Sequence, residues 1–162
     1  MPAGMSVIGV KNLLVERTVF SNTNGTSPQA GCDLEPDQPF QELTNVTFKD
    51  CLSFGNSGSG WQFYLRNFDT TTNPFSITLD NFTITSAGTN CFSLWEVQPH
   101  VRGNFSIRNS YGYHGAHGTP PVGTGCIDAV CNLQDCRPSD KPRPGTCAVS
   151  GVCPHNLTLH CE

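Results

Sequence analysis

The sequence lacks several features by which a chain of this size is often assigned to a class of protein. No stretch approaches the roughly 20 consecutive apolar residues that span a bilayer. The N-terminal segment has no basic region followed by a continuous apolar run, so it is not a secretory signal peptide. No Gly-x-Ser-x-Gly elbow, Walker loop or dinucleotide fingerprint occurs, which argues against serine hydrolases and nucleotide-dependent enzymes.

Charged residues are also scarce, at 14% of the 162 residues, and the formal net charge is −4. An acidic chain does not suit nucleic acid or an anionic membrane as a partner, because both carry negative charge themselves. No amphipathic helical pattern of useful length appears, although the chain is long enough for one domain with a core. These observations favour an all-β domain with no nucleic-acid partner and no membrane insertion.

Cysteine, by contrast, is abundant, with nine residues. Six of them lie among Pro and Gly in the last 37 residues: Cys126, Cys131, Cys136, Cys147, Cys153 and Cys161. No Cys-x2-Cys pair occurs, so disulfides are favoured over zinc, and disulfides indicate an oxidising compartment. We therefore expect a secreted protein whose signal peptide is missing from this chain, with a disulfide-stapled segment over residues 119–162. The odd total leaves at least one thiol unpaired or paired with another chain.

Five Asn-x-Ser/Thr sequons also suggest a secreted glycoprotein, at Asn24, Asn45, Asn81, Asn104 and Asn156. Four of them recur within a repeat that begins at residues 12, 45, 81, 104 and 156 and reads Asn, apolar, usually Thr or Ser, apolar. Asn at a fixed place in each copy suits a stacked turn, in which each amide bonds to the turn below. The period-2 alternation predicts strands buried on one face. The expected inward residues are Leu13, Val15, Val46, Phe48, Phe82, Ile84, Phe105, Ile107, Leu157 and Leu159.

A second strand motif falls between these copies: GCDLEP from residue 31, GWQFYL from residue 60, CFSLWE from residue 91 and, more loosely, CIDAVC from residue 126. Aligned on Leu34, Phe63, Leu94 and Ala129, the copies are 29, 31 and 35 residues apart. The alternating motifs predict two strands per repeat, and repeats of this length indicate a solenoid. We expect an all-β, parallel β-solenoid of about four to five coils over residues 5–118, with a final coil strand at the C-terminus. A disulfide-braced β-sandwich is the alternative.

The segments VKNLLVERTVFSNTNGTSPQAGCDLEPDQP and LTNVTFKDCLSFGNSGSGWQFYL resemble right-handed parallel β-helix proteins of the pectin-lyase-like group, in particular the right-handed β-helix repeat domains. The resemblance covers about residues 5 to 110. It implies a right-handed parallel β-helix, which is a single-stranded β-solenoid, and polysaccharide binding along a strand-lined face. Such domains usually have more coils, so it also implies that this chain is a fragment or a short isoform. The chain has no full lyase motif and no paired-Asp signature of polygalacturonases.

The acidic stretch QAGCDLEPDQP, residues 29–39, contains the main candidate site residues. If Cys32 and Leu34 point inward as core residues, Asp33 and Glu35 point outward on one face, about 6.8 Å apart. Stacked coils extend this face into two columns: Asp33, Gln62, Ser93 and Asp128, and beside it Glu35, Tyr64, Trp95 and Val130. Carboxylates, an amide and aromatic rings suit the hydroxyls and apolar faces of a glycan. A flat, elongated face suits a polymer better than a small metabolite.

The acids have three possible roles. Asp33 and Glu35 could divide acid and base work in glycoside hydrolysis, where about 6.5 to 9.5 Å separates the two carboxyl groups of inverting enzymes. Asp33, Glu35 and Asp37 could instead hold Ca²⁺. In many polysaccharide lyases Ca²⁺ neutralises a uronate and a Lys or Arg removes its proton, and Arg66 is the nearest such base by register. Finally, the acids could brace the turn at the two following prolines, which is the favoured role for Asp37.

The sequence therefore predicts one of two functions. The first is a secreted β-helix that interacts with a polysaccharide or glycan, as a lyase, glycoside hydrolase or epimerase, or as a binding module. The second is a non-catalytic structural or adhesion module of a larger extracellular protein. The sequence decides neither whether the chain is an enzyme nor its oligomeric state. His114 and His117, in the loop YHGAHG, favour solvent exposure over metal binding or catalysis.

Overall fold

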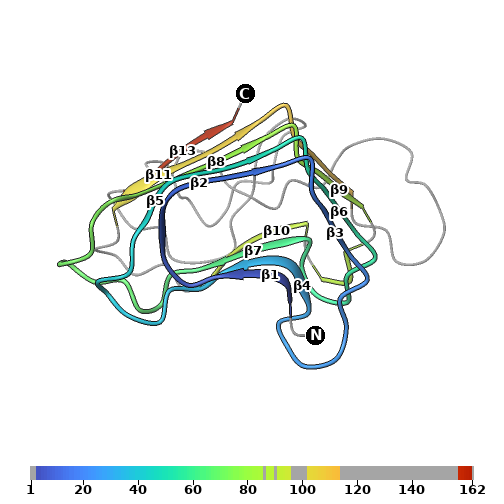
Figure 1. The fold of residues 1–162 in the computed structure, drawn as a ribbon, viewed down its shortest axis with the longest axis horizontal. Coiled ribbons are helices and arrows are strands. Elements are labelled where there is room, and N and C mark those ends of the chain that lie inside the picture. The colour runs from blue at the N-terminus through green and yellow to red at the C-terminus, as the bar shows by residue number, and fades with distance from the viewer. Residues whose placement is uncertain (1–2, 86, 90, 96–101, 114–156, 162) are drawn as a thin grey trace, which may run out of the picture.

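A computed structural model describes residues 3–85, 87–89, 91–95, 102–113 and 157–161. In this part of the chain all regular structure is β-strand, so no helix there is long and apolar enough to cross a membrane. The strands form three sheets, A, B and C, which the chain visits in turn, so that each turn adds one strand to every sheet (Figure 1). All pairings between neighbouring strands of the described residues are parallel. The fold is a parallel β-solenoid.

The three sheets differ in strand length. Sheet A contains β1 (Ala3–Val7), β4 (Ala30–Leu34), β7 (Trp61–Tyr64) and β10 (Phe92–Trp95). Sheet B contains β2 (Val10–Glu16), β5 (Leu43–Lys49), β8 (Phe75–Asp80), β11 (Gly103–Arg108) and β13 (Leu157–Cys161). Sheet C contains β3 (Val19–Ser21), β6 (Leu52–Phe54), β9 (Thr83–Thr85) and β12 (Tyr111–Tyr113). The chain thus completes about three turns between β1 and β10, against the four to five coils predicted from the sequence, and sheets A, B and C contain four, five and four strands.

The predicted register of the second motif is confirmed in sheet A. Leu34 pairs with Phe63, and Phe63 pairs with Leu94, as the 29- and 31-residue spacings of the sequence required. The fourth copy, around Ala129, lies outside the described residues. The predicted strand at the C-terminal end is β13, which pairs with β11.

Two expectations about the first motif are wrong. Each turn contains three strands, not two, and the copy at residue 81 is not equivalent to the copy at residue 45. Val46 of β5 pairs with Ile77 of β8 in sheet B. In the copy at residue 81, by contrast, Ile84 lies within β9 of sheet C and Phe82 directly precedes that strand. The alternating pattern could not distinguish these two copies, because a strand of any sheet alternates in the same way when one of its faces packs on the core.

The core fills the interior of the solenoid, and the described inward residues predicted from the sequence lie in it. Val46, Phe48, Phe82 and Ile84 are fully buried, and Leu13 and Val15 pack against the core from the first turn. Aromatic rings from different turns meet there: Trp61 stacks on Phe105 with ring centroids 5.3 Å apart. Such contacts between turns make the interior one continuous core.

The corner between sheets B and C is a stacked turn of left-handed residues. Arg17, Asp50, Asn81 and Asn109 each follow the B strand of their turn, and their φ angles lie between 48° and 54°. Asn is well suited to this conformation because its short side chain bonds locally. The Nδ2 of Asn81 donates to Asp50 Oδ1 at 2.7 Å, and so links two turns.

Candidate functional site

Sheet A brings the predicted site residues into the expected columns. Asp33 of β4 pairs with Gln62 of β7, and Gln62 pairs with Ser93 of β10. Tyr64 pairs with Trp95 in the neighbouring column. These pairs have the register that the sequence predicted, and Glu35 follows directly after β4. Asp128 and Val130, and likewise His114 and His117, lie outside the described residues.

The exposure of Asp33 differs from the expectation. We predicted a water-facing carboxylate, but Asp33 is only 2% exposed, and all five residues of β4 are buried. Cys32 and Leu34 fill the core on one side of the strand, so Asp33 lies on the opposite side and is covered there. Gln62, Tyr64 and Glu35 are half-buried and remain accessible to a ligand. A period-2 pattern predicts the side of a strand on which a residue lies, but not what covers that side.

The Asp33 carboxyl group is electrostatically unusual. Its pKa is raised to about 7, first by burial and then by the charge of the nearby Glu35 carboxylate and a hydrogen bond with it, while a hydrogen bond with Gln62 acts in the opposite direction. One oxygen, Oδ1, is buried without any hydrogen-bond partner. The site therefore combines a buried acid with a half-buried carboxyl group, Glu35, that a ligand can reach.

The loop after β4 is held by groups that the sequence did not single out. The backbone N of Glu35 donates to Val7 O at 3.0 Å, which continues the pairing with β1. Asn67 Nδ2 donates to Pro36 O at 3.0 Å and ties the loop to the next turn. The backbone N atoms of Asp37 and Gln38 both donate to the side-chain oxygen of Gln41, at 2.5 and 2.9 Å. In the sequence, only the position of Asn67 one turn after Pro36 could have indicated the contact between these two residues.

These contacts bear on the metal and base predictions. Asp37 is exposed, and the brace of its turn comes from an amide side chain and not from the acids. No group of three His, Cys, Asp or Glu side chains that could hold a metal ion occurs among the residues described here, and the Ca²⁺ role of Asp33, Glu35 and Asp37 stays a prediction. Arg66 is exposed and lies in the turn just beyond β7.

The cysteines that the structure describes form part of the interior. Cys32 and Cys91 are fully buried in the core, as predicted, and Cys51 is 3% exposed. No disulfide joins these three residues. Burial raises the pKa of Cys32 well above its usual value, with a further increase from the charge of Asp33, so this thiol is not a nucleophile. The disulfide prediction concerned residues 119–162, where no cysteine side chain is among those described.

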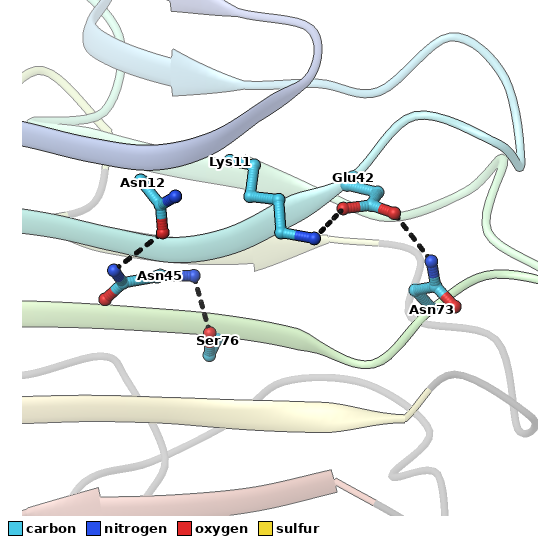
Figure 2. Close-up of polar contacts among 6 residues, drawn as sticks. All are labelled: Lys11, Asn12, Glu42, Asn45, Asn73 and Ser76. Carbon is cyan, nitrogen blue, oxygen red and sulfur yellow. Dashed lines mark hydrogen bonds and ion pairs between the residues drawn. The ribbon is translucent and has the colours of Figure 1, made fainter.

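A second group of polar side chains lies at the start of sheet B (Figure 2). Asn45 Nδ2 donates to Asn12 Oδ1 at 2.9 Å, and the backbone N of Asn45 donates to Ser76 Oγ at 2.7 Å. Asn12 and Asn45 are left-handed, with φ of 61° and 55°, and occupy equivalent places in β2 and β5. An amide ladder of the expected kind therefore exists, but Asn45 and Asn81 belong to two different ladders.

Beside this ladder, a carboxylate links three successive turns. Glu42 accepts a hydrogen bond from Asn73 Nδ2 at 2.6 Å and lies 3.7 Å from Lys11 Nζ (Figure 2). Exposed ion pairs of this kind contribute about 0 to 1 kcal/mol. Because the three groups satisfy one another at the surface, we assign them to the alignment of turns and not to the candidate site.

No family model matches the chain, and neither the curated proteins nor the solved structures include a match to it.

Proposed function

We propose that this chain is a β-helix module that binds a glycan along the outer face of sheet A, through Glu35, Gln62 and Tyr64, with Asp33 behind them. The observation that carries this proposal is the buried, unpartnered Oδ1 of Asp33 beside a half-buried carboxylate. A buried oxygen without a partner costs about 1 to 3 kcal/mol. A ligand hydroxyl, which both donates and accepts, would satisfy this oxygen once the groups that cover Asp33 move aside.

The surroundings of the pair support a sugar over a small charged ligand. Gln62 offers an amide that donates and accepts, and Tyr64 offers a ring together with a hydroxyl. Their pairing partners in the next turn are Ser93 and Trp95, so the same mixture of residue types continues along the solenoid axis. Repetition in successive turns, with strands about 4.8 Å apart, suits a polymer whose units repeat as well.

We also propose a more specific function, which rests on the resemblance of the sequence to pectin-lyase-like proteins. On that assignment the chain is a secreted fragment of a longer β-helix protein that acts on a polysaccharide as a lyase, hydrolase or epimerase. A general acid needs a carboxyl group that keeps its proton near neutral pH, and the raised pKa of Asp33, about 7, gives it this property. Glu35 would be the residue that reaches the glycan, and Asp33 would lie behind it.

A structural or adhesion module is the second candidate, and the burial of Asp33 favours it. A side chain that is 2% exposed cannot contact a polymer unless its cover moves. Many β-solenoids present polar faces that serve only solubility, and fold alone does not assign function. This candidate predicts that no glycan binds and that substitutions at Glu35 and Tyr64 affect only stability.

Glycan binding to the secreted protein distinguishes the two candidates. We expect wild type to bind at least one extended glycan on an array of neutral and uronate-containing polysaccharides. Glu35→Gln and Tyr64→Ala should each weaken that binding about 10-fold or more, because they remove a polar contact and a stacking surface. Glu16→Gln, a matched change at an exposed site on β2, should leave binding unchanged. Reducing ends and unsaturated products, followed in the same samples, would add catalysis to binding.

The proposal fails if well-folded wild type binds no glycan of the array, or if Glu16→Gln weakens binding as much as Glu35→Gln does. Binding without turnover would support the module and remove the enzymatic assignment. The variant Asp33→Asn gives a further test of the proposed binding site. Because the pKa of Asp33 is raised to about 7, this variant should alter the pH dependence of binding more than binding at its optimum.

A further inference from the structure

The Asn-x-Ser/Thr sequons of the chain lie in different kinds of structure. Asn24 lies in the loop between β3 and β4, Asn45 within β5, Asn81 at the corner between sheets B and C, and Asn104 within β11. Asn156 lies outside the described residues. Because a sequon accepts an N-linked glycan where it lies in a surface loop of a secreted protein, these places are not equivalent as acceptors.

Three of these sequons each contain a core residue. Their middle residues are Val46, Phe82 and Phe105, and none of the three is more than 2% exposed. Ser106, the third residue of the last of them, is itself only 3% exposed. Because a sequon is defined by its first and third residues, a transferase must bind both at once, and the residue between them must then leave the core. In these three sequons that movement breaks strand pairing and the packing of a turn.

The side-chain nitrogens of two of them also take part in the ladders. Asn45 Nδ2 donates to Asn12 Oδ1 at 2.9 Å, and Asn81 Nδ2 donates to Asp50 Oδ1 at 2.7 Å. An N-linked glycan is attached to this same nitrogen, so modification would compete with the bonds that align the turns. At residues 45 and 81 the sequon therefore has a structural role in the solenoid.

The sequon at Asn24 contains no core residue. Asn24, Gly25 and Thr26 are all exposed, and none of them belongs to a strand. The connection between β3 and β4 extends outward from the sheets (Figure 1). Gly25 has a φ of 105°, a conformation that glycine adopts readily, so the loop turns at the middle residue of the sequon. An enzyme can therefore bind all three residues without opening the core.

Both ends of this loop are fixed. The backbone N of Thr23 donates to Asn56 Oδ1 at 3.1 Å, in the next turn, and both residues are buried. Thr23 Oγ1 donates to Gln29 O, which joins the two ends of the loop, and the backbone N of Gly58 donates to the same Gln29 O at 3.0 Å. The exposed residues 24–27 can thus be bound by a transferase, and can carry a glycan, while the turns remain paired.

We infer that Asn24 carries an N-linked glycan, and that the sequons at Asn45, Asn81 and Asn104 stay largely unmodified in the folded chain. The co-reactant is an oligosaccharide carried on a polyprenyl diphosphate. Asn24 Nδ2 forms a bond to C1 of the first sugar, and the bond from C1 to the diphosphate oxygen breaks. The lipid diphosphate leaves, and Nδ2 gives up one proton to a base of the transferase. The inference rests on the secreted location in the proposed function but not on the glycan-binding face, so either can fail alone.

Glycan transfer to the folded chain tests this choice of site. Full-length, unglycosylated protein is incubated with a purified single-subunit oligosaccharyltransferase and a polyprenyl-diphosphate oligosaccharide, and peptide mapping by mass spectrometry follows each Asn. We expect Asn24 to be modified at least about 10-fold faster than Asn45, Asn81 or Asn104, because those three can react only when a strand opens. Synthetic peptides with the same four sequons are the matched control. Their rates should differ much less, since a peptide has no core to open.

Variants of the loop separate the sequon from its surroundings. Thr26→Ala should abolish transfer to Asn24, and Thr26→Ser should retain it. Ser27→Ala, at an exposed neighbour outside the sequon, should leave transfer unchanged. The inference is overturned if Asn24 accepts no glycan in the folded chain, if Asn45 or Asn81 reacts as fast as Asn24 there, or if the peptides show the same ranking as the folded chain.

Discussion

Asp33 is a carboxyl group that the fold removes from water without giving both oxygens a partner. Its place in the strand could be predicted, because alternation puts Cys32 and Leu34 in the core and Asp33 opposite them. Its burial could not be predicted, because that depends on what covers the outer face, and no local pattern encodes a cover. The same limit applies to Gln41 and Asn67, which hold the adjacent loop through contacts that only the folded chain creates.

The raised pKa of Asp33 makes a prediction about stability. Its pKa is about 7 in the folded protein, against about 3.9 in an unfolded chain, so the native state holds the proton more tightly. The stability that the neutral acid contributes is complete below about pH 4 and is lost as the pH rises through about 7. Asp33→Asn removes this titration. Above pH 7 the variant should therefore gain stability relative to wild type, by at most about 4 kcal/mol compared with pH 4.

Urea unfolding of both proteins at intervals of pH measures this difference. Asp37→Asn is the matched control, since Asp37 is exposed and lies in the same loop. Its stability difference from wild type should change little over the same range. Parallel pH curves for wild type and Asp33→Asn would show that Asp33 does not hold its proton in the folded state.

At the scale of strands and corners, the sequence predicted sheet A better than sheet C. β7 and β10 carry four alternating residues each and could be aligned on Phe63 and Leu94. β3, β6 and β9 have three residues, which is too short for an alternating pattern to distinguish a strand from a turn. The Asn residues marked real ladders, but the sequence could not divide them between the B-to-C corner and the positions within β2 and β5, because the same left-handed backbone suits Asn at both.

The B-to-C corner makes a prediction that separates its two sources of stability. Asn81 combines a left-handed backbone, with φ of 52°, and a hydrogen bond to Asp50. Asn81→Gly loses the hydrogen bond alone and should cost about 1 kcal/mol. Asn81→Ala also forces an alanine into the left-handed region and should cost about 1 to 2 kcal/mol more. Urea unfolding of unglycosylated protein measures both, and equal costs would show that backbone conformation is not what selects Asn here.

At the scale of the whole molecule, stability should vary along the solenoid axis. Each turn contacts only the turns beside it, so a solenoid is held together by nearest-neighbour interfaces. A middle turn has two such interfaces and the first turn has one. This gradient could not be predicted from the repeat, because Leu13 and Val46 occupy the same position of the motif and look equivalent in the sequence. Only the stack shows that Val46 is fully buried and Leu13 is not.

The gradient predicts an inverted order of two truncations. Leu13→Ala removes more hydrocarbon than Val46→Ala, so two equivalent sites would make it the costlier change. Because Leu13 packs on one side only, we expect it to cost about 1 kcal/mol, against about 2 to 3 kcal/mol for Val46→Ala, where a cavity forms between two turns. Urea unfolding measures both. A larger loss for Leu13→Ala would mean that Leu13 is packed at least as well as Val46 and that stability does not vary along the axis in this way.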